Sequence, residues 1–287
     1  MAGSQRCDAC EPAEQDVAMS VITISRGSFT GGKMLAECLA KRLGYRCVDR
    51  DVIVERAAAH GVSQEEIRDA LERPPGFLER FSQKRYKYLA LIQASLTEEV
   101  REGKVIYHGL AGHLLLGSGR HILRTRLIAP MDYRVRMVHE RLNYTRSEAI
   151  AYIQKMDDQR RRWTSYLYGV NWGDPELYDL VINLEQMTIE TACHIVSAAV
   201  HRRCFELTPA CRKALADLAL ASKVRAMLAV APATEGLELE AIASDGVVKL
   251  KGKLSSAGQF AEVRRIAMDI PGVIDLDLDK LAPPVQG

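Results

Sequence analysis

The sequence has no long apolar run, few aromatic residues and almost no net charge. No segment reaches the roughly 18 to 20 apolar residues that a membrane-spanning helix needs, and residues 1–20 contain no apolar block typical of a signal peptide. Because Lys and Arg (39) nearly balance Asp and Glu (37) and only 6% of residues are aromatic, we do not expect a nucleic-acid partner. The composition is that of a folded protein, which we predict to be cytoplasmic.

The seven cysteines do not form a pattern typical of disulfide-rich proteins. Their number is odd and they are scattered along the chain, which favours reduced thiols. Cys7 and Cys10 form a C-x-x-C, but no second pair or histidine cluster accompanies it. We therefore predict no metal site and interpret this stretch as part of a flexible tail, residues 1–17.

The 287 residues correspond to about two domains of roughly 150 residues. In residues 18–205, short β-rich runs alternate with helical periodicity, which predicts an α/β domain with a five-stranded parallel sheet and helices on both faces. We expect strands in 17–25, 46–49, 105–107, 122–128 and 180–183, and helices in 33–43, 52–60, 77–102, 131–142, 147–156 and 189–203. Ligands of such sheets bind at the carboxyl ends of the strands.

The pattern changes at Thr208-Pro209. Residues 206–287 predict a small α+β domain with the order αββαβ. Its helices are expected in 211–228 and 260–268, and its strands in 237–243, 247–252 and 273–278. Asp245-Gly246 is a hairpin signal between the first two strands.

A glycine-rich turn links the first expected strand to the first expected helix. Gly27-Ser-Phe-Thr-Gly-Gly32-Lys33 matches G-x-x-x-x-G-K, in which backbone N–H groups, a helix N-terminus and a lysine hold phosphates. A purely structural turn is the alternative. The expected nucleotide-binding residues are Gly27, Thr30, Gly31, Gly32, Lys33 and Met34.

Met34 occupies the place where the motif normally has Ser or Thr. That hydroxyl contacts Mg²⁺, and a thioether is a poor ligand for so hard a cation. We expect Thr30, or a magnesium ion held by phosphates and water, to compensate.

Positive charge is concentrated downstream of this turn. Residues 118–165 contain eleven Lys and Arg against five acids, a net +6, although the whole chain has only +2. Phosphoryl transfer needs cations around both phosphates. The segment therefore favours a small phosphorylated substrate, with Arg160, Arg161 and Arg162 as expected lid residues; a solvated basic helix face is the alternative.

Several stretches in the first two thirds of the chain resemble the cytidylate kinase-like family, which comprises P-loop nucleoside monophosphate kinases. They run in the family's order over about residues 20–200: Ile22–Arg26, Gly31-Gly32, Leu43–Ile53, Ala129-Pro130, Arg134, Arg141, Asp157-x-x-Arg160, Trp172–Pro175 and Tyr178–Asn183. The resemblance implies a P-loop kinase-type fold, ATP with Mg²⁺ as cofactor, and phosphoryl transfer to CMP or dCMP without a covalent intermediate.

Site residues follow from the same resemblance. It implies that Lys33 holds the donor phosphates and that Asp49 contacts the acceptor nucleotide. It also implies that Arg134, Arg141 and Arg160 clamp phosphates, with Asp157 orienting Arg160. Lys33, Asp157 and Arg160 are the expected catalytic residues.

The chain departs from the family pattern after the third expected strand. The family has a Gly-Arg pair there, whereas this chain has Gly109-Leu110, flanked by His108 and His113. Either histidine could substitute as a phosphate ligand, or both could be structural. Together with Met34, this departure supports a second hypothesis, a catalytically weak nucleotide-binding regulatory protein.

The last 75 residues resemble a BON domain, on Ala243–Gly252 and Ile266–Val273. The resemblance implies contact with a protein or a lipid surface. Residues 206–287 contain ten Lys and Arg against eleven acids, so no electrostatic membrane anchor is evident. Lys249, Lys251 and Lys253 alternate along one strand, either as a reader of anions or as protection of a strand edge.

Overall fold

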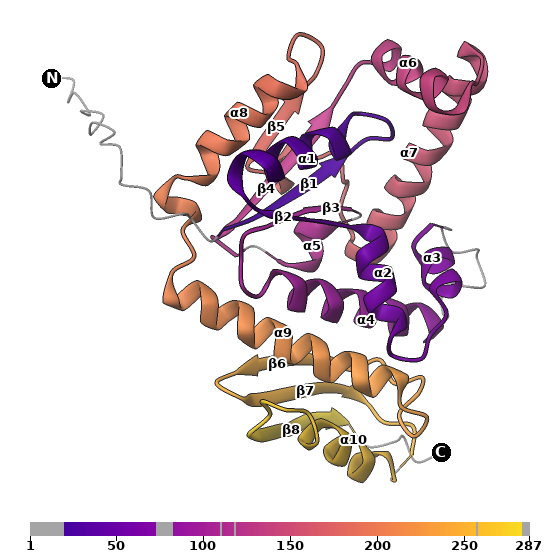
Figure 1. Cartoon of the computed structure of the whole chain (residues 1–287). Coiled ribbons are helices and arrows are strands. Elements are labelled where there is room, and N and C mark those ends of the chain that lie inside the picture. Colours follow the sequence, from indigo (N-terminus) through magenta and orange to yellow (C-terminus); the bar gives the residue numbers. More distant parts are fainter. Residues whose placement is uncertain (1–19, 73–82, 110, 118, 257, 283–287) are drawn as a thin grey trace, which may run out of the picture.

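The computed structural model describes residues 20–72, 83–109, 111–117, 119–256 and 258–282. These residues form a large sheet with helices on both faces and a smaller sheet with helices of its own (Figure 1). The predicted tail 1–17, with its C-x-x-C, lies outside the described residues.

The large sheet has five strands, all of them parallel, as predicted. Its order is β2-β3-β1-β4-β5. The strands are β1 (Val21–Arg26), β2 (Arg46–Asp49), β3 (Val105–His108), β4 (Ile122–Ile128) and β5 (Leu180–Asn183). Because β1 is central, the loop that follows it lies in the middle of the carboxyl edge, where ligands of such sheets bind.

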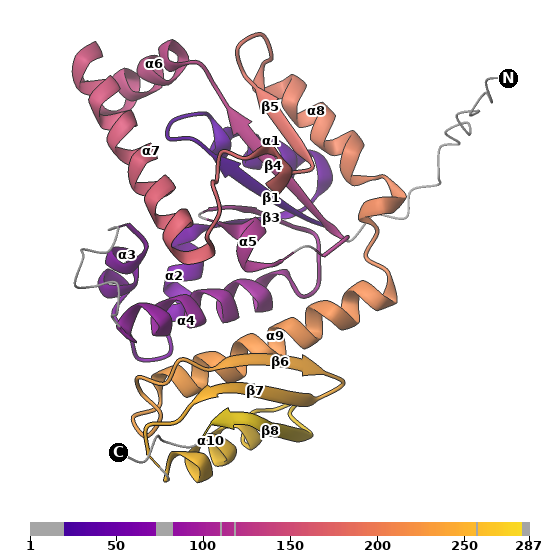
Figure 2. The same ribbon diagram turned by 180° about the vertical axis from the view of Figure 1, so that it is seen from behind.

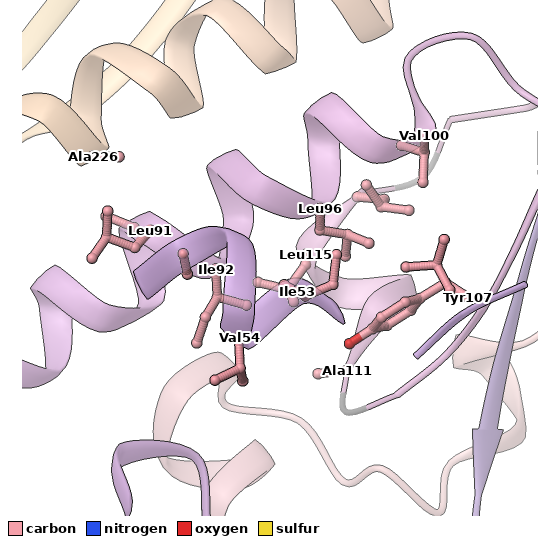
Figure 3. Close-up of a cluster of buried hydrophobic side chains, with 14 of the residues drawn as sticks. Ile53, Val54, Leu91, Ile92, Leu96, Val100, Tyr107, Ala111, Leu115 and Ala226 are labelled. Atoms are coloured by element: carbon pink, nitrogen blue, oxygen red, sulfur yellow. The ribbon is translucent and has the colours of Figure 1, made fainter. Parts of the chain in front are cut away.

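Side chains of each strand alternate between two buried layers. Val21 belongs to a cluster with residues of α2 (Arg50–Ala58) and α4 (Gln83–Val100), some of which are drawn in Figure 3. Ile22 belongs to a second cluster, on the other face, with residues of α1 (Gly32–Leu43) and α8 (Ile189–Val200). Both faces of the sheet are therefore covered, which explains why β1, β3 and β4 are buried along almost their whole length.

Two helices differ from the sequence prediction. The helix α3 (Gln64–Glu72) was not expected, although Ser63 and Glu66 form the hydrogen bonds of a capping box at its start. The sequence predicted a helix that ends at Met156, whereas the observed helix α7 (Arg146–Tyr168) continues for about three further turns. The buried side chains of Ile153 and Trp163 anchor both ends of the charged segment between them, so that segment stays helical.

The remaining elements of this part are short or match their predicted positions. They are α5 (Gly112–Leu115), α6 (Met131–Leu142), and the 3-10 turns η2 (Pro175–Leu177) and η3 (Arg203–Phe205).

The C-terminal part has the predicted order αββαβ. It comprises α9 (Pro209–Val230), β6 (Glu240–Ser244), β7 (Val247–Lys253), α10 (Gln259–Met268) and β8 (Asp275–Ala282). In the sheet order β6-β7-β8, β6 and β7 are antiparallel whereas β7 and β8 are parallel.

Helix α9 belongs to two hydrophobic cores at once. Ala226 and Ala229 are buried in the cluster that contains α4, whereas Val224 and Leu228 are buried against the small sheet. Both ribbon views show α9 between α4 and the small sheet (Figures 1 and 2). Within the described residues, neither α9 nor any other helix is long and apolar enough to cross a bilayer.

Candidate active site

A cavity of about 660 Å³ lies at the carboxyl ends of the central strands. Arg26 ends β1, Asp49 ends β2 and His108 ends β3, and all three line the cavity. The opposite wall comes from α7, which contributes Tyr152, Met156, Gln159, Arg160 and Thr164. The remaining lining residues are Ser25, Lys33, Arg50, Asp51, Gly109, Ala111, His113 and Trp172.

The glycine-rich loop connects β1 to α1 and is mostly buried. Gly31 adopts a left-handed conformation with φ of 81° and forms the N-cap of α1 without a side-chain cap. The Thr30 hydroxyl donates a hydrogen bond of 3.1 Å to the Gly27 carbonyl oxygen, which tightens the loop. The N-terminus of α1 therefore keeps its backbone N–H groups uncapped by side chains, as a phosphate site requires.

Lys33 and Met34 follow in the first turn of α1. Lys33 lines the cavity, but its side chain is 60% exposed and forms an ion pair of 3.8 Å with Glu37. Met34 is exposed and does not line the cavity. These two residues therefore lie at the margin of the site, although the motif would make Lys33 its central cation.

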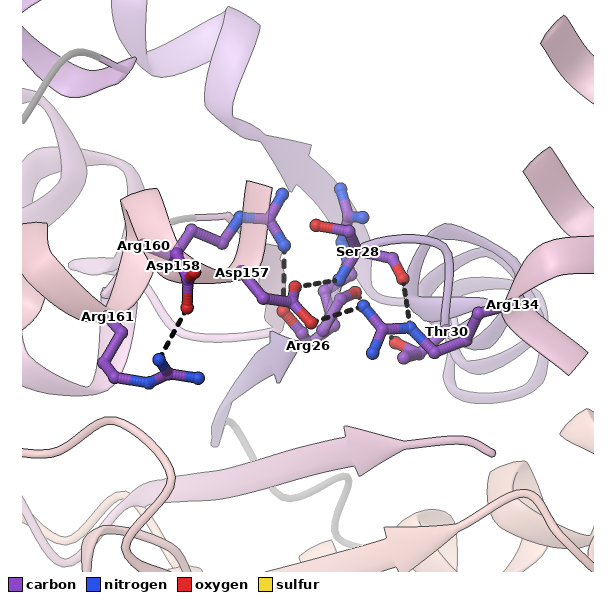
Figure 4. Close-up of polar contacts among 9 residues, drawn as sticks. Arg26, Ser28, Thr30, Arg134, Asp157, Asp158, Arg160 and Arg161 are labelled. Atoms are coloured by element: carbon purple, nitrogen blue, oxygen red, sulfur yellow. Dashed lines mark hydrogen bonds and ion pairs between the residues drawn. The ribbon is translucent and has the colours of Figure 1, made fainter. Parts of the chain in front are cut away.

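Asp157 and Arg134 hold the glycine loop from outside (Figure 4). The Asp157 carboxylate accepts a hydrogen bond of 3.0 Å from the backbone N–H of Ser28. Its other oxygen lies 2.5 Å from Nη2 of Arg134, and Nε of Arg134 donates to the Ser28 carbonyl oxygen at 2.7 Å. This arrangement, which we name the Asp157–Arg134 clasp, joins α6 and α7 to the loop.

The hydrogen bonds of Asp157 and Arg160 go to different groups. Those of Asp157 go to Ser28 and Arg134. Nη1 of Arg160 donates to the carbonyl oxygen of Arg26 at 3.1 Å. Asp157 and Arg160 are three residues apart and lie on the same face of α7, but Asp157 contacts the loop at Ser28 whereas Arg160 contacts the end of β1.

Arg160 is a cation in a poorly solvated position. Burial, and secondarily the nearby Arg26, lower the pKa of its guanidinium to about 10, so it remains charged at neutral pH. Arg161 and Arg162 lie on the same continuous helix, and Arg161 pairs with Asp158 at 2.6 Å. Of the three consecutive arginines, only Arg160 lines the cavity.

Of the two remaining predicted substrate-binding residues, Asp49 lies at the cavity and Arg141 does not. Asp49 lines the cavity, and its Oδ1 also caps α2 by accepting hydrogen bonds from the N–H groups of Asp51 and Val52 at 2.9 and 3.0 Å. Arg141 is exposed near the end of α6 and does not line the cavity. The structure thus brings Asp49 together with Lys33 and Arg160, but not Arg141.

Both histidines of the segment after β3 line the cavity and are buried. Burial, together with Arg124 and Arg126, lowers the pKa of His113 to about 4, and burial also lowers the pKa of His108. Both are therefore neutral at pH 7 and do not replace the charge of the missing arginine. Among the described residues, Nδ1 of His108 and Nε2 of His113 have no hydrogen-bond partner.

The sequence analysis assigned no site role to several lining residues, although Arg26, Arg50 and Trp172 lie in stretches that carry the family resemblance. Arg26, Arg50 and Gln159 line the cavity, as does Trp172, which packs under the guanidinium of Arg126 at 4.4 Å from the ring centre. For Arg26 a signal existed: it is a charged residue at the end of an otherwise apolar strand. Arg50 and Gln159 have ordinary surface patterns, and only the fold brings them to the cavity.

Comparison with known proteins identifies the family of each part of the chain. The family model described as "Cytidylate kinase-like family" matches residues 21–186, and the BON domain model matches residues 216–277. A cytidylate kinase of Pyrococcus horikoshii is 28% identical over 182 residues, which cover 63% of this chain and 88% of that protein. A cytidylate kinase of Staphylothermus marinus is 28% identical over 189 residues, which cover 64% of this chain and 98% of that protein.

Among solved structures, an uncharacterized protein from Eubacterium ventriosum is similar, with a TM-score of 0.51 and 17% identity over 63% of this chain and 98% of that one. At this identity the similarity concerns the fold. The family model covers more than half of the chain and includes the glycine loop, the Asp157–Arg134 clasp and Arg160. The chain therefore belongs to the cytidylate kinase-like family, and its N-terminal part is a nucleotide kinase unit to which a BON domain is joined.

Proposed function

We propose that this protein transfers the γ-phosphoryl group of ATP to a nucleoside monophosphate, with CMP or dCMP as the acceptor. The observation that carries the proposal is the placement of cations on both sides of one cavity. Arg26 and Lys33 approach from β1 and α1, and Arg160 approaches from α7. The choice of a cytosine nucleotide as the acceptor rests on the similarity to the cytidylate kinases.

In this mechanism the protein positions the two nucleotides and neutralises charge. The acceptor phosphate attacks the γ-phosphate directly, so no protein nucleophile is needed. Backbone N–H groups at the start of α1 hold the donor phosphates, and Arg160, which extends from α7 to the end of β1, neutralises charge on the transferred group. Asp49 and His113 lie on the acceptor side of the proposed site, where the neutral imidazole offers a hydrogen bond to the base.

Magnesium fits this site as part of the nucleotide complex. In the described part of the chain, no group of three His, Cys, Asp or Glu side chains is arranged to hold a metal ion. Thr30 is engaged with Gly27 and Met34 is exposed, whereas the buried hydroxyl of Ser28 in the same loop has no hydrogen-bond partner among the described residues. Mg²⁺ bound to ATP by phosphate and water oxygens neutralises charge on the β- and γ-phosphates.

A nucleotide panel tests the proposed activity. Purified full-length protein is assayed for ADP release with ATP, Mg²⁺ and one of CMP, dCMP, UMP or AMP. We expect turnover with CMP and dCMP at higher kcat/KM than with UMP or AMP. Binding of ATP without turnover of any acceptor would instead support the regulatory hypothesis, which Met34 and the sequence Gly109-Leu110 in place of a Gly-Arg pair favour.

We further propose that the BON domain contacts protein rather than lipid. The exposed face of its sheet is neutralised by cross-strand pairs, because Lys249 pairs with Asp277, and Lys251 pairs with Glu240 at 3.0 Å. Its firm attachment through α9 favours a regulatory or assembly role close to the kinase unit.

A further inference from the structure

The glycine loop allows two alignments with the phosphate-binding motif, and they differ in the residue that supplies the cation. If Gly27 is the first glycine, the cation is Lys33. If the motif is shifted back by one residue, Arg26 stands at the first glycine, Gly31 at the second, and Gly32 at the position of the lysine. In the shifted alignment, position 26 has an arginine where the motif has a glycine, and position 32 has a glycine where the motif has a lysine.

The secondary structure is compatible with the shifted alignment. In the motif, the loop begins as the strand ends and the lysine follows as the helix begins. Here β1 ends at Arg26, Gly31 is the left-handed N-cap, and α1 begins at Gly32. Lys33 is one residue further into the helix, where it lines the cavity and also forms an ion pair of 3.8 Å with Glu37.

The side chain of Arg26 lies across Gly32. A Cβ atom built on Gly32 would be 2.0 Å from Cδ of Arg26, 3.0 Å from its Cγ and 3.1 Å from its Cβ. No side chain at position 32 is compatible with this arrangement, because 2.0 Å is far inside van der Waals contact. The glycine at position 32 therefore makes room for Arg26.

Arg26 also has the electrostatic properties of an anion-binding residue. It lines the cavity, and among the described residues no ion pair of its guanidinium is found. Burial is the main cause that lowers the pKa of its guanidinium; the charges of Arg50 and of the exposed Arg141 lower it further, and that of Asp49 raises it. A partly buried guanidinium without an ion-pair partner is costly unless an anion joins it.

We infer that Arg26 is the main side-chain ligand of the β- and γ-phosphates of the donor nucleotide, in place of a motif lysine, with Lys33 in a secondary role at the margin. This inference rests on the proposed function for the identity of the ligand. A guanidinium suits the task, because its planar N–H groups bind phosphate oxygens in pairs and its charge does not titrate near neutral pH.

Calorimetric titration with ATP, ADP and adenosine tests the inference. We expect Arg26→Ala to weaken ATP and ADP binding about 10- to 100-fold and to leave adenosine binding unchanged, because only the phosphates contact Arg26. Arg26→Lys restores part of the affinity. Lys33→Ala has a smaller effect than Arg26→Ala, and Lys41→Ala, an exposed lysine at the far end of the same helix, has none.

A second variant covers the case in which Arg26→Ala does not fold. Gly32→Ala keeps the charge but displaces the Arg26 side chain, and it too is expected to weaken ATP binding. The inference is overturned if Arg26→Ala or Gly32→Ala binds ATP as the wild type does, if Lys33→Ala loses more affinity than Arg26→Ala, or if the wild type binds adenosine as tightly as ATP. A different result, that the wild type turns over no acceptor, would contradict the proposed function without contradicting the role of Arg26 in ATP binding.

Discussion

Asp157 of α7 and Arg134 of α6 form an ion pair of 2.5 Å whose two members also hydrogen-bond to the backbone of Ser28. The pair is mostly buried, since the side chains are 18% and 11% exposed. It links two helices that pack together to the loop that follows β1. The clasp thus fixes the loop before any nucleotide binds, which reduces the entropy that binding must remove.

Breaking the clasp is expected to destabilise the protein. Asp157→Asn removes the charge that Arg134 faces and weakens the bond to the Ser28 N–H, which we expect to lower the free energy of unfolding by about 1.5 to 3 kcal/mol. Urea unfolding measures this change. The matched control is Arg146→Ala, which breaks the exposed pair with Asp132 between the same two helices and should cost less than about 1 kcal/mol. Equal losses in both variants would contradict the role given to the clasp.

Three buried histidines are expected to make the protein sensitive to acid. Burial is the first cause that lowers the pKa of His108, His113 and His121 in the folded state. The unfolded chain therefore binds more protons than the folded chain below the ordinary histidine pKa of 6.5, and the free energy of unfolding falls as pH falls from there toward 4. For His113 alone the loss is on the order of 3 kcal/mol at the acid limit.

Unfolding by urea at a series of pH values between 7 and 4 checks this prediction. The variant His113→Phe keeps an aromatic ring beside Tyr178, 4.8 Å away between ring centres, and should flatten the pH dependence. Replacement of the exposed His60 by Gln is the control and should leave the pH dependence of the free energy of unfolding unchanged. A wild-type stability independent of pH in this range would exclude the explanation.

The contact between α4 and the C-terminal sheet is expected to make the two parts unfold together. The Tyr86 hydroxyl donates to the Leu239 carbonyl oxygen and accepts from the Leu239 N–H at 3.1 Å. Tyr86→Phe leaves both backbone groups without this partner and should lower the free energy of unfolding by about 1 to 3 kcal/mol.

Hydrogen exchange at β6, combined with urea unfolding, reports this effect. The control at the same interface is Lys87→Ala, which removes the pair of 3.3 Å with the exposed Glu235 and should cost under about 1 kcal/mol. If Tyr86→Phe changes neither stability nor exchange at β6, the interface does not couple the two parts.

The charge pairs of the small sheet predict weak attraction to anionic membranes. Full-length protein should sediment with phosphatidylserine vesicles no more than with phosphatidylcholine vesicles at physiological salt, because Lys249 and Lys251 already face carboxylates. The double variant Asp277→Asn, Glu240→Gln releases both lysines and should gain binding. Salt-sensitive sedimentation of the wild type with phosphatidylserine would favour a lipid partner instead.

Local patterns were sufficient to predict most elements of the fold. The alternation of apolar strands and helical periodicity predicted the five parallel strands, and the hairpin signal Asp245-Gly246 predicted β6 and β7. Such patterns depend on neighbouring residues, so they are visible in one sequence. The extension of α7 was missed because its charged residues 157–162 interrupt the apolar periodicity, while buried contacts of Ile153 and Trp163 stabilise the helix on either side.

The sequence by itself determined the two kinds of domain, the glycine loop after the first strand and the concentration of arginines that pointed to a phosphorylated substrate. Only the tertiary structure decided which of these residues meet. The pairing of Asp157 with Arg134, the position of Arg26 across Gly32 and the sharing of α9 by two cores all depend on how elements pack. Such contacts are set by backbone paths in space, which spacing along the chain does not specify.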